Sequence, residues 1–346
     1  MGKLTFAGLG LGGRGISLES IEAIRESDIS YLEYYTSPHE PAMLQELTRA
    51  TGKELVIVDR AFVEDGRRIL EEASKKKVVL TVQGDPMIAT THAELRVRAM
   101  KQEIQTRVIH GATVVSAVAS ESGLHYYKFG KMVTYTGDGM NLHRQVYQTI
   151  HQNLRYGLHT LLLLEFDVER GRGVDPAVAI QGLTAAELNF KRAVIDESTF
   201  IIVLSRIGAG DFRIQAGPLG KLSGVDFGRP PHCIIVPGEM HFTEVESVSV
   251  VCGIPENEVK DNAAKVKRTA QVLVPKYLEK TRRALAKARE SLGDSYQNLL
   301  ENVELYMKDA ETHLSNEEDE LAMLSVGYAE GLLDSLTYTD RLKIEW

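Results

Sequence analysis

The sequence predicts an α/β protein made of two α/β domains followed by a helical module. Through about residue 250, short apolar stretches that suit buried strands alternate with stretches of helical spacing. That alternation is typical of mainly parallel sheets covered by helices. A new set of strands begins after residue 112, and strand patterns stop at about residue 256. We therefore expect domains over residues 1–112 and 113–255 and a helical extension over 256–346.

The first domain is expected to contain short buried strands, because its apolar runs are brief and rich in Val, Ile and Leu. A helical pattern at residues 92–104 precedes the last of these runs. The expected strands cover residues 4–10, 29–35, 53–59, 76–82 and 106–111.

The second domain repeats the same kind of pattern and is separated from the first near residue 112. Its longer amphipathic stretches predict helices between the strands. The expected strands cover residues 132–136, 160–166, 199–205, 212–217 and 233–238, and the expected helices cover 142–154, 176–190 and 243–251.

Beyond residue 256, apolar residues keep the spacing of amphipathic helices. Pro275 interrupts the first stripe and should break or kink it, or begin a new helix. Another stripe follows Gly293 and Asp294. The segment from Ser315 to Glu318 then reads as a capping box, which predicts the start of a last helix. The apolar residues of these stripes are Val266, Ala270, Leu273, Tyr277, Leu285, Ala288, Leu292, Leu299, Val303, Tyr306, Ala310, Leu314, Leu321, Leu324, Tyr328 and Leu332.

The composition is that of a globular protein of 346 residues with a formal net charge of −8. This charge argues against nonspecific nucleic-acid binding as the main activity. The two cysteines, Cys233 and Cys252, suggest neither a disulfide framework nor a zinc cluster, and no HExxH or CxxC spacing suggests a metal site. No apolar run approaches about 20 residues, and the N-terminus lacks a signal-peptide pattern. We expect a cytoplasmic protein without a membrane partner.

The glycine-rich turn near the N-terminus allows two interpretations. Gly8, Gly10 and Gly13 spell GxGxxG after a strand, and Glu33 follows where an acid would bind a ribose hydroxyl. This pattern would predict a dinucleotide oxidoreductase. In such enzymes the helix begins within the glycines and faces the pyrophosphate, whereas the first good N-cap here is Ser17. A glycine-rich turn that lets a ligand approach the backbone closely is therefore the favoured interpretation.

Asp85 and His232 are candidate ligand-binding residues. Asp85 follows a strand, at the sheet edge where α/β proteins bind ligands, although it could also simply form a turn with Pro86. His232 follows two prolines that fix an extended backbone, although a structural histidine is the more frequent role.

Residues 121–131 concentrate aromatic side chains between two glycines. These rings could form a wall for a cationic ligand. A partly buried loop anchored by its aromatic residues is the more frequent arrangement.

Seven segments, in order between residues 3 and 254, carry a family resemblance. They are FAGLGL at 6–11, EYYTS at 33–37, GDPMIATTHAELRVRA at 84–99, SAV at 116–118, SGLHYYKFGK at 122–131, GLHTLLLLE at 157–165 and PPHCIIVPG at 230–238. Together they resemble the diphthine synthases, S-adenosylmethionine-dependent methyltransferases of the tetrapyrrole methylase-like, class III architecture. GLGL and GDP alone would indicate only the wider methylase group, whereas GDPMIATTHAEL combined with GLHYYKFGK is specific to the subfamily.

The resemblance implies a methyl-donor cleft between two α/β domains, to which the GLGL turn belongs. S-adenosylmethionine has no phosphate, so no helix N-terminus needs to face one. The implied product is S-adenosylhomocysteine, and no metal is implied. Thr113 and Val114 stand where the family has a Ser-Ile pair, and Ile207 replaces the usual alanine. The residues that match the family's donor contacts are Leu11, Asp85, Ile88, Thr113, Val114, Leu164, Ile207 and His232.

The resemblance also implies a protein substrate, elongation factor 2 carrying an aminocarboxypropyl-modified histidine. Repeated N-methylation of its amino group would give the trimethylammonium of diphthine in diphthamide biosynthesis. The sulfonium is an activated donor, so transfer mainly requires a neutral amine held at near-attack distance. We assign no general base. The alternatives are a related methylase acting on a small tetrapyrrole and a cofactor-binding scaffold without turnover.

The implied assembly is a homodimer. Typical members of the family end soon after the segment matching VSVVCGIPENEV, so residues 256–346 depart from the pattern. This extension resembles small helical modules of archaeal proteins. We expect it to support a dimer, dock the elongation factor or stabilise the fold.

Overall fold

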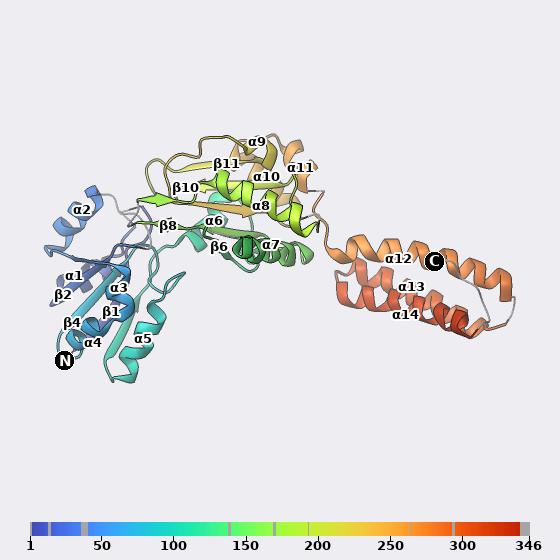
Figure 1. The fold of residues 1–346 in the computed structure, drawn as a ribbon, viewed down its shortest axis with the longest axis horizontal. Helices are drawn as coiled ribbons and strands as arrows, with labels where there is room; N and C mark the ends of the chain where they lie inside the picture. Colours follow the sequence, from blue (N-terminus) through green and yellow to red (C-terminus); the bar gives the residue numbers. More distant parts are fainter. Residues whose placement is uncertain are drawn as a thin grey trace. The chain divides into compact units, whose positions relative to one another are not determined.

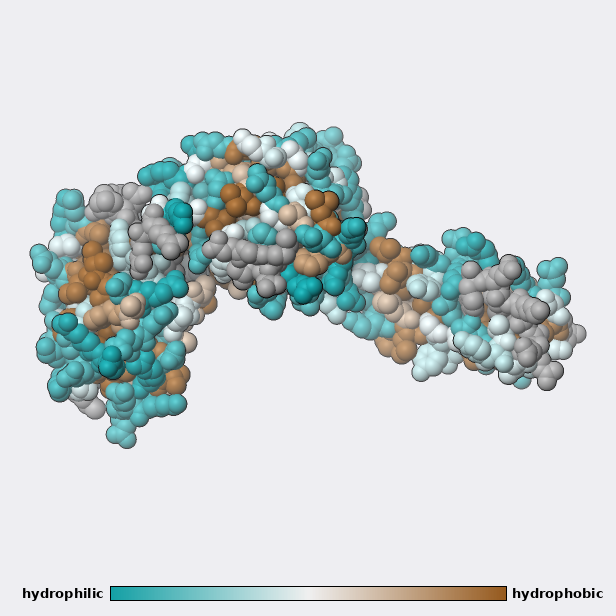
Figure 2. Space-filling view, viewed as in Figure 1, coloured by the Kyte–Doolittle hydropathy of each residue, from teal (hydrophilic) through white to brown (hydrophobic). Residues whose placement is uncertain are grey.

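The computed structural model describes residues 2–12, 15–35, 41–137, 140–168, 171–192, 194–263, 265–292 and 295–339 (Figure 1). Gly13, Thr36, Ser37, Gly293 and Asp294, which belong to patterns named above, lie outside these residues. The chain divides into two compact units, one within residues 1–153 and 158–264 and the other within 265–346 together with 154–157. No helix of the described ranges is both long and apolar enough to cross a membrane. Figure 2 shows apolar residues gathered in patches among hydrophilic ones on the visible face.

The first sheet is parallel throughout, as the alternating pattern predicts. Its strand order is β3-β2-β4-β1-β5, and each neighbouring pair runs in the same direction. The carboxyl ends of all these strands therefore lie at one edge of the sheet. The strands are β1 (Lys3–Gly8), β2 (Ile29–Glu33), β3 (Val56–Val58), β4 (Lys77–Val82) and β5 (Gln105–Ile109).

Helices cover both faces of this sheet. Leu4 and Phe6 of β1 pack with residues of α3 (Arg60–Asp65), α4 (Arg67–Ala73) and α5 (His92–Lys101). Ala7, the next residue of the strand, packs instead with residues of α1 (Leu18–Arg25) and α2 (Pro41–Thr51). Because successive side chains of a strand point to opposite faces, an almost unbroken apolar run fills two cores at once.

The second sheet is mixed. Its order is β11-β10-β12-β7-β6, and only β6 and β7 are parallel, whereas the other neighbours are antiparallel. A short hairpin, β8 (Phe166–Asp167) with β9 (Arg172–Gly173), follows β7. The strands of the sheet are β6 (Val133–Tyr135), β7 (Thr160–Leu164), β10 (Phe200–Ser205), β11 (Arg213–Pro218) and β12 (His232–Val236).

The three helices predicted around the second sheet are present, and α8 (Pro176–Phe190) matches its prediction at both ends, whereas two further helices there were not predicted. Residues of β7, β10 and β12 share one core with α6 and α10. The remaining elements are α6 (Val114–Ser122), the 3-10 turn η1 (Tyr126–Lys128), α7 (Met140–Arg155), α9 (Leu219–Leu222), α10 (Phe242–Cys252) and α11 (Glu256–Ala263).

The second unit is a bundle of α12 (Thr269–Leu292), α13 (Gln297–Ser315) and α14 (Asp319–Tyr338). The expected break at Pro275 is wrong, because α12 continues through it. Proline removes one backbone hydrogen bond, but Val274 and Leu278 on either side are buried in the bundle core. Tertiary burial of the apolar stripe outweighs the local loss.

The expected capping box at Ser315 is also wrong. Ser315 is the last residue of α13, and its hydroxyl donates to the carbonyl of Thr312 at 2.7 Å. Glu318 is the N-cap of α14 without a side-chain cap. The turn is closed instead by the Glu318 amide, which donates to the His313 carbonyl at 2.9 Å. A serine near a helix end can bond its own helix as readily as it caps the next one.

Candidate functional site

Three loops meet backbone to backbone at the carboxyl edge of the first sheet. Gly10 and Gly84 form an isolated antiparallel bridge, in which the Gly84 amide donates to the Gly10 carbonyl at 2.9 Å. A Cβ atom on Gly8 would lie 2.7 Å from the Gly84 carbonyl oxygen and from the Gly111 amide nitrogen. Gly8, the last residue of β1, is therefore required because neighbouring backbone occupies the space that a side chain would need.

The start of α1 argues against a pyrophosphate loop. Ser17 is the N-cap, as predicted, and its hydroxyl accepts from the Ser20 amide at 3.1 Å. The Ser20 hydroxyl in turn donates to the Gly8 carbonyl at 3.0 Å. Glu33 is 1% exposed, and one of its oxygens accepts from the Tyr35 amide at 2.8 Å. The predicted ribose-binding acid is thus part of the interior.

Asp85 joins two of the meeting loops. Its Oδ1 accepts from the Met87 amide at 2.8 Å, and its Oδ2 accepts from His110 Nδ1 at 2.8 Å and from the Gly111 amide at 3.3 Å. The residue is 6% exposed. His110, an exposed residue that the sequence analysis did not single out, is the only side chain among these three donors, because the other two are backbone amides. Asp85 is therefore more than a turn former.

One pocket brings together all the residues that the resemblance assigns to the methyl donor. Its lining comes from the loops at the edge of the first sheet and from β7, β10 and β12 of the second. The predicted residues that line it are Leu11, Asp85, Ile88, Thr113, Val114, Leu164, Ile207 and His232. The other lining residues, which were not predicted, are Gln83, Gly84, Ala89, Leu163, Phe166, Leu204, Pro231 and Cys233.

Two buried acceptors in this pocket have no hydrogen-bond partner among the described residues. His232 Nε2 donates to the Gly228 carbonyl at 3.2 Å, which leaves Nδ1 with a lone pair. Burial lowers the pKa of His232, more than the bond to Gly228 raises it, so the ring is neutral near pH 7. Gln83 Nε2 donates to the Gly10 carbonyl at 2.6 Å, while Gln83 Oε1 is unpaired. An unpaired buried acceptor is costly unless a ligand supplies an N–H or O–H group.

The cysteines of the chain are free thiols. Burial raises the pKa of Cys233, which lines the pocket, to about 12, and burial raises that of Cys252 to about 12. Both therefore stay protonated and are poor nucleophiles. Within the described ranges, no group of three or more His, Cys, Asp or Glu side chains could hold a metal ion.

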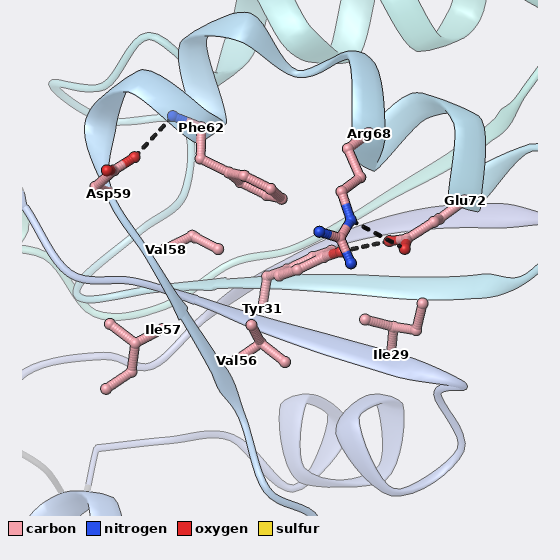
Figure 3. Close-up of a pocket in the computed structure, with 9 residues that line it drawn as sticks. All are labelled: Ile29, Tyr31, Val56, Ile57, Val58, Asp59, Phe62, Arg68 and Glu72. Carbon is pink, nitrogen blue, oxygen red and sulfur yellow. Dashed lines mark hydrogen bonds and ion pairs between the residues drawn. The ribbon is translucent and has the colours of Figure 1, made fainter.

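A larger pocket at the β3 edge of the first sheet has different chemistry (Figure 3). It measures about 400 Å³, compared with about 170 Å³ for the pocket around Asp85. Its polar side chains pair with one another, because the Tyr31 hydroxyl donates to Glu72 and Arg68 Nε lies 3.4 Å from Glu72 Oε1. Burial, together with the Glu72 bond, raises the pKa of Tyr31 to about 12. Size alone would select this pocket, but the unpaired acceptors favour the smaller one.

Comparison with known proteins identifies the family. The family model for Tetrapyrrole (Corrin/Porphyrin) Methylases matches residues 3–223. Diphthine synthase of Methanosarcina mazei is 36% identical over 266 residues, which cover 75% of this chain and 99% of that protein. Diphthine synthase of Methanocella arvoryzae is 37% identical over 260 residues, covering 72% and 98%. A crystal structure of diphthine synthase aligns with a TM-score of 0.67 at 32% identity, covering 74% of this chain and 98% of that one.

The chain belongs to the diphthine synthases. As the resemblance implied, it is an S-adenosylmethionine-dependent methyltransferase of diphthamide biosynthesis with the tetrapyrrole methylase-like fold. Its diphthine synthase relatives do not favour a small tetrapyrrole substrate or a scaffold without turnover. A second family model, Protein of unknown function (DUF357), matches residues 276–342, beyond the methylase match. About a quarter of the chain therefore has no counterpart in the relatives above.

Proposed function

We propose that the pocket around Asp85 holds S-adenosylmethionine and that the chain methylates the modified histidine of elongation factor 2. The acceptor is the amino group of the aminocarboxypropyl side chain, and repeated transfer gives the trimethylammonium of diphthine. The observation that supports this proposal is the convergence of all eight family-matched residues on one pocket.

The residues of the pocket fit this donor. The apolar side chains of Leu164 and Ile207 suit the adenine ring and the carbon chain. Gln83 Oε1 and His232 Nδ1 are unpaired acceptors, and the donor molecule has N–H and O–H groups on its adenine, ribose and amino-acid parts. The Asp85 carboxylate is a counter-charge for its positively charged groups. When bound, the donor supplies a methyl group already activated on sulfur.

The chain's own residues then have to hold and dehydrate the reacting groups. Asp85 fixes the loop of Met87 against that of Gly111, which keeps the two walls of the pocket in register. The apolar lining excludes water and disfavours the charged form of an entering ammonium group. A neutral amine at near-attack distance is what the transfer requires.

The test is mass spectrometry of elongation factor 2 that carries the unmethylated precursor, after incubation with the protein and S-adenosylmethionine. We expect mass gains in steps of one methyl group on that histidine, up to three. Donor affinity is measured in parallel by calorimetry. Donor binding without any mass gain would contradict the proposed acceptor and leave the donor site standing.

We also propose, from the family resemblance, a homodimer that works in the cytoplasm without a metal, a nucleic acid or a membrane as partner. Light scattering of the purified chain tests the dimer, because a monomer mass at micromolar concentration would contradict it. Retention of transfer activity after dialysis against a chelator tests the independence from metal.

A further inference from the structure

Five aromatic rings follow one another on the surface of the domain built on the second sheet, and we call this row of side chains the ring chain. Its members are Tyr126, Tyr127, His125, His241 and Phe242. Successive ring centroids are 5.6, 5.2, 6.1 and 4.2 Å apart in that order. Tyr126, Tyr127 and Phe242 are 78%, 66% and 71% exposed. Two segments more than a hundred residues apart in sequence thus build one continuous aromatic surface.

The loop of the ring chain is partly buried and anchored by one of its aromatic residues, as the more frequent arrangement predicts, but its two tyrosines are exposed. Leu124 of this loop lies in the core of the second sheet, and Phe129 packs against that core. Its ring meets that of His159 at 5.4 Å in an edge-on arrangement. The Tyr127 hydroxyl lies 2.8 Å from His125 Nδ1, and the exposed faces of the two tyrosine rings remain accessible to a partner.

A single buried carboxylate fixes both halves of the ring chain. Glu244 is fully buried and accepts from the amides of His125 and His241, each at 2.8 Å. It also accepts from His159 Nε2 at 2.9 Å and Lys128 Nζ at 2.6 Å. Burial would raise the pKa of Glu244, but these hydrogen bonds outweigh it and hold the pKa well below its usual range.

The base under the rings is rigid. The Gly238 amide donates to His159 Nδ1 at 2.9 Å, which fixes the tautomer that donates to Glu244. A Cβ on Gly123, at the end of α6, would lie 2.9 Å from the Ser247 side chain on α10, so these elements are in close contact. Exposed rings on a preorganised base bind a partner with little loss of conformational entropy.

The ring chain lies at the opposite end of the second sheet from the donor pocket. Strand β7 begins next to His159, which contacts Glu244, and ends at Leu164 in the pocket, and its five residues span about 16 Å. Helix α6 runs from Val114 in the pocket to Ser122, and nine helical residues span about 13 Å. A small molecule in the pocket cannot reach the rings, whereas a folded protein can cover both.

Exposed clustered aromatic residues are the usual centres of binding energy in protein interfaces. The faces of the rings attract cations, and the Lys128 ammonium below them is already neutralised by Glu244. The chain as a whole has a net charge of −8, which favours association with a basic surface.

We propose that the ring chain is the docking site for the protein acceptor, elongation factor 2, through a surface segment that presents Arg or Lys next to apolar side chains. This inference rests on the proposed function and adds a second contact to it. The docked protein is held by the ring chain while its modified histidine reaches the pocket.

The test measures binding of precursor-bearing elongation factor 2 to the full chain by interferometry, together with steady-state transfer. In the variant Tyr126→Ala/Tyr127→Ala, we expect Kd and KM for the protein to rise about tenfold or more, with kcat and donor affinity unchanged. Phe242→Ala should act in the same direction. The control is Met100→Ala, which removes a side chain that is 57% exposed on α5 and should change nothing.

Two further variants test the chemistry of the contact. Tyr126→Phe/Tyr127→Phe keeps the rings and should bind as the wild type does. Tyr126→Leu/Tyr127→Leu keeps apolar bulk without ring faces, so its binding of the elongation factor should remain weak. Wild-type affinity in this variant would contradict the proposal that the rings contact Arg or Lys side chains of the partner.

The outcomes separate the two proposals. Unchanged binding in the alanine variants, or no binding of the elongation factor by the wild type, overturns the docking site. Intact binding that depends on the rings, without methyl transfer by the wild type, supports the docking site and contradicts the proposed reaction.

Discussion

Replacing Asp85 with alanine should weaken binding of S-adenosylmethionine more than tenfold. The substitution removes a nearly buried carboxylate that accepts three hydrogen bonds, from the Met87 amide, His110 and the Gly111 amide. These donors belong to two loops that line or adjoin the pocket. The variant therefore loses both a charge in the pocket and the connection that holds two of its walls together.

The magnitude follows from the hydrogen bonds that are lost. A bond to a charged group contributes about 1.5–3 kcal/mol, and a factor of ten in affinity corresponds to about 1.4 kcal/mol. The loss of one such contact to the donor is thus enough for the predicted change. The unfolding free energy should also fall by about 2–4 kcal/mol, because the Met87 and Gly111 amides lose their acceptor.

Calorimetric titration with S-adenosylmethionine measures the affinity, and thermal unfolding measures the stability. Asp85→Asn is the matched control, because its amide oxygen can still accept from the Met87 amide while the negative charge is gone. We expect this variant to lie between the wild type and Asp85→Ala in stability and to be weak in donor binding. A donor Kd of Asp85→Ala within twofold of the wild type, with reduced stability, would show that Asp85 only supports the loops and would refute the assignment.

Three other predictions test the fold. The pKa of Glu244 is lowered in the folded state, so its contribution to stability is complete above about pH 5 and is lost as the pH falls through the folded pKa. In urea unfolding, Glu244→Gln should therefore have a lower unfolding free energy than the wild type at pH 7 but lose less of it between about pH 5 and pH 3. Parallel curves of unfolding free energy against pH for the two proteins would contradict this. Gly111→Ala places a Cβ 2.3 Å from the Gly84 carbonyl and should cost more than about 3 kcal/mol or prevent folding. Gly210→Ala, where a Cβ meets nothing within 4 Å, should change the unfolding free energy by less than about 0.5 kcal/mol, and equal effects of the two would sink the steric argument. A truncated protein that ends at residue 264 should keep donor binding and methyl transfer, because the 75% of the chain that matches the Methanosarcina mazei relative covers 99% of that relative. Loss of donor affinity on truncation would contradict this prediction.

The fold was largely predictable because its local patterns agree with its tertiary structure. Strands that are buried on both faces are continuous apolar runs. The start of α8 is marked by the Asp175 cap and by a proline in the first turn. The expectation of mainly parallel strands was wrong for the second sheet, because a doubly buried run looks the same in a parallel and an antiparallel pair. The break expected at Pro275 and the capping box expected at Ser315 rest on local signals, which burial overrules in the first case and a competing hydrogen bond in the second.

The glycines show a limit of another kind. Their density predicts close backbone approach, but not what approaches. Gly8 packs against the backbone of Gly84 and Gly111, and Gly10 forms a bridge with Gly84, so two glycines of the nucleotide-like pattern are explained by packing between loops. Ligand binding near such a turn has to be argued from side chains such as Asp85 and His232.

Glu244 illustrates why the second contact surface was invisible in the sequence. Within its helical stretch it is one of two acids, and no pattern marks it as buried. Its partners His159 and Lys128 lie 85 and 116 residues earlier in the chain, and its other two bonds come from backbone amides, which almost any residue could provide. Moving a carboxylate out of water costs free energy, so a carboxylate that is buried and held by this many donors serves a structural purpose. In this protein Glu244 fixes two loops whose exposed rings contribute nothing to the core. Binding of these rings to a partner outside the chain explains why the desolvation cost of Glu244 is tolerated.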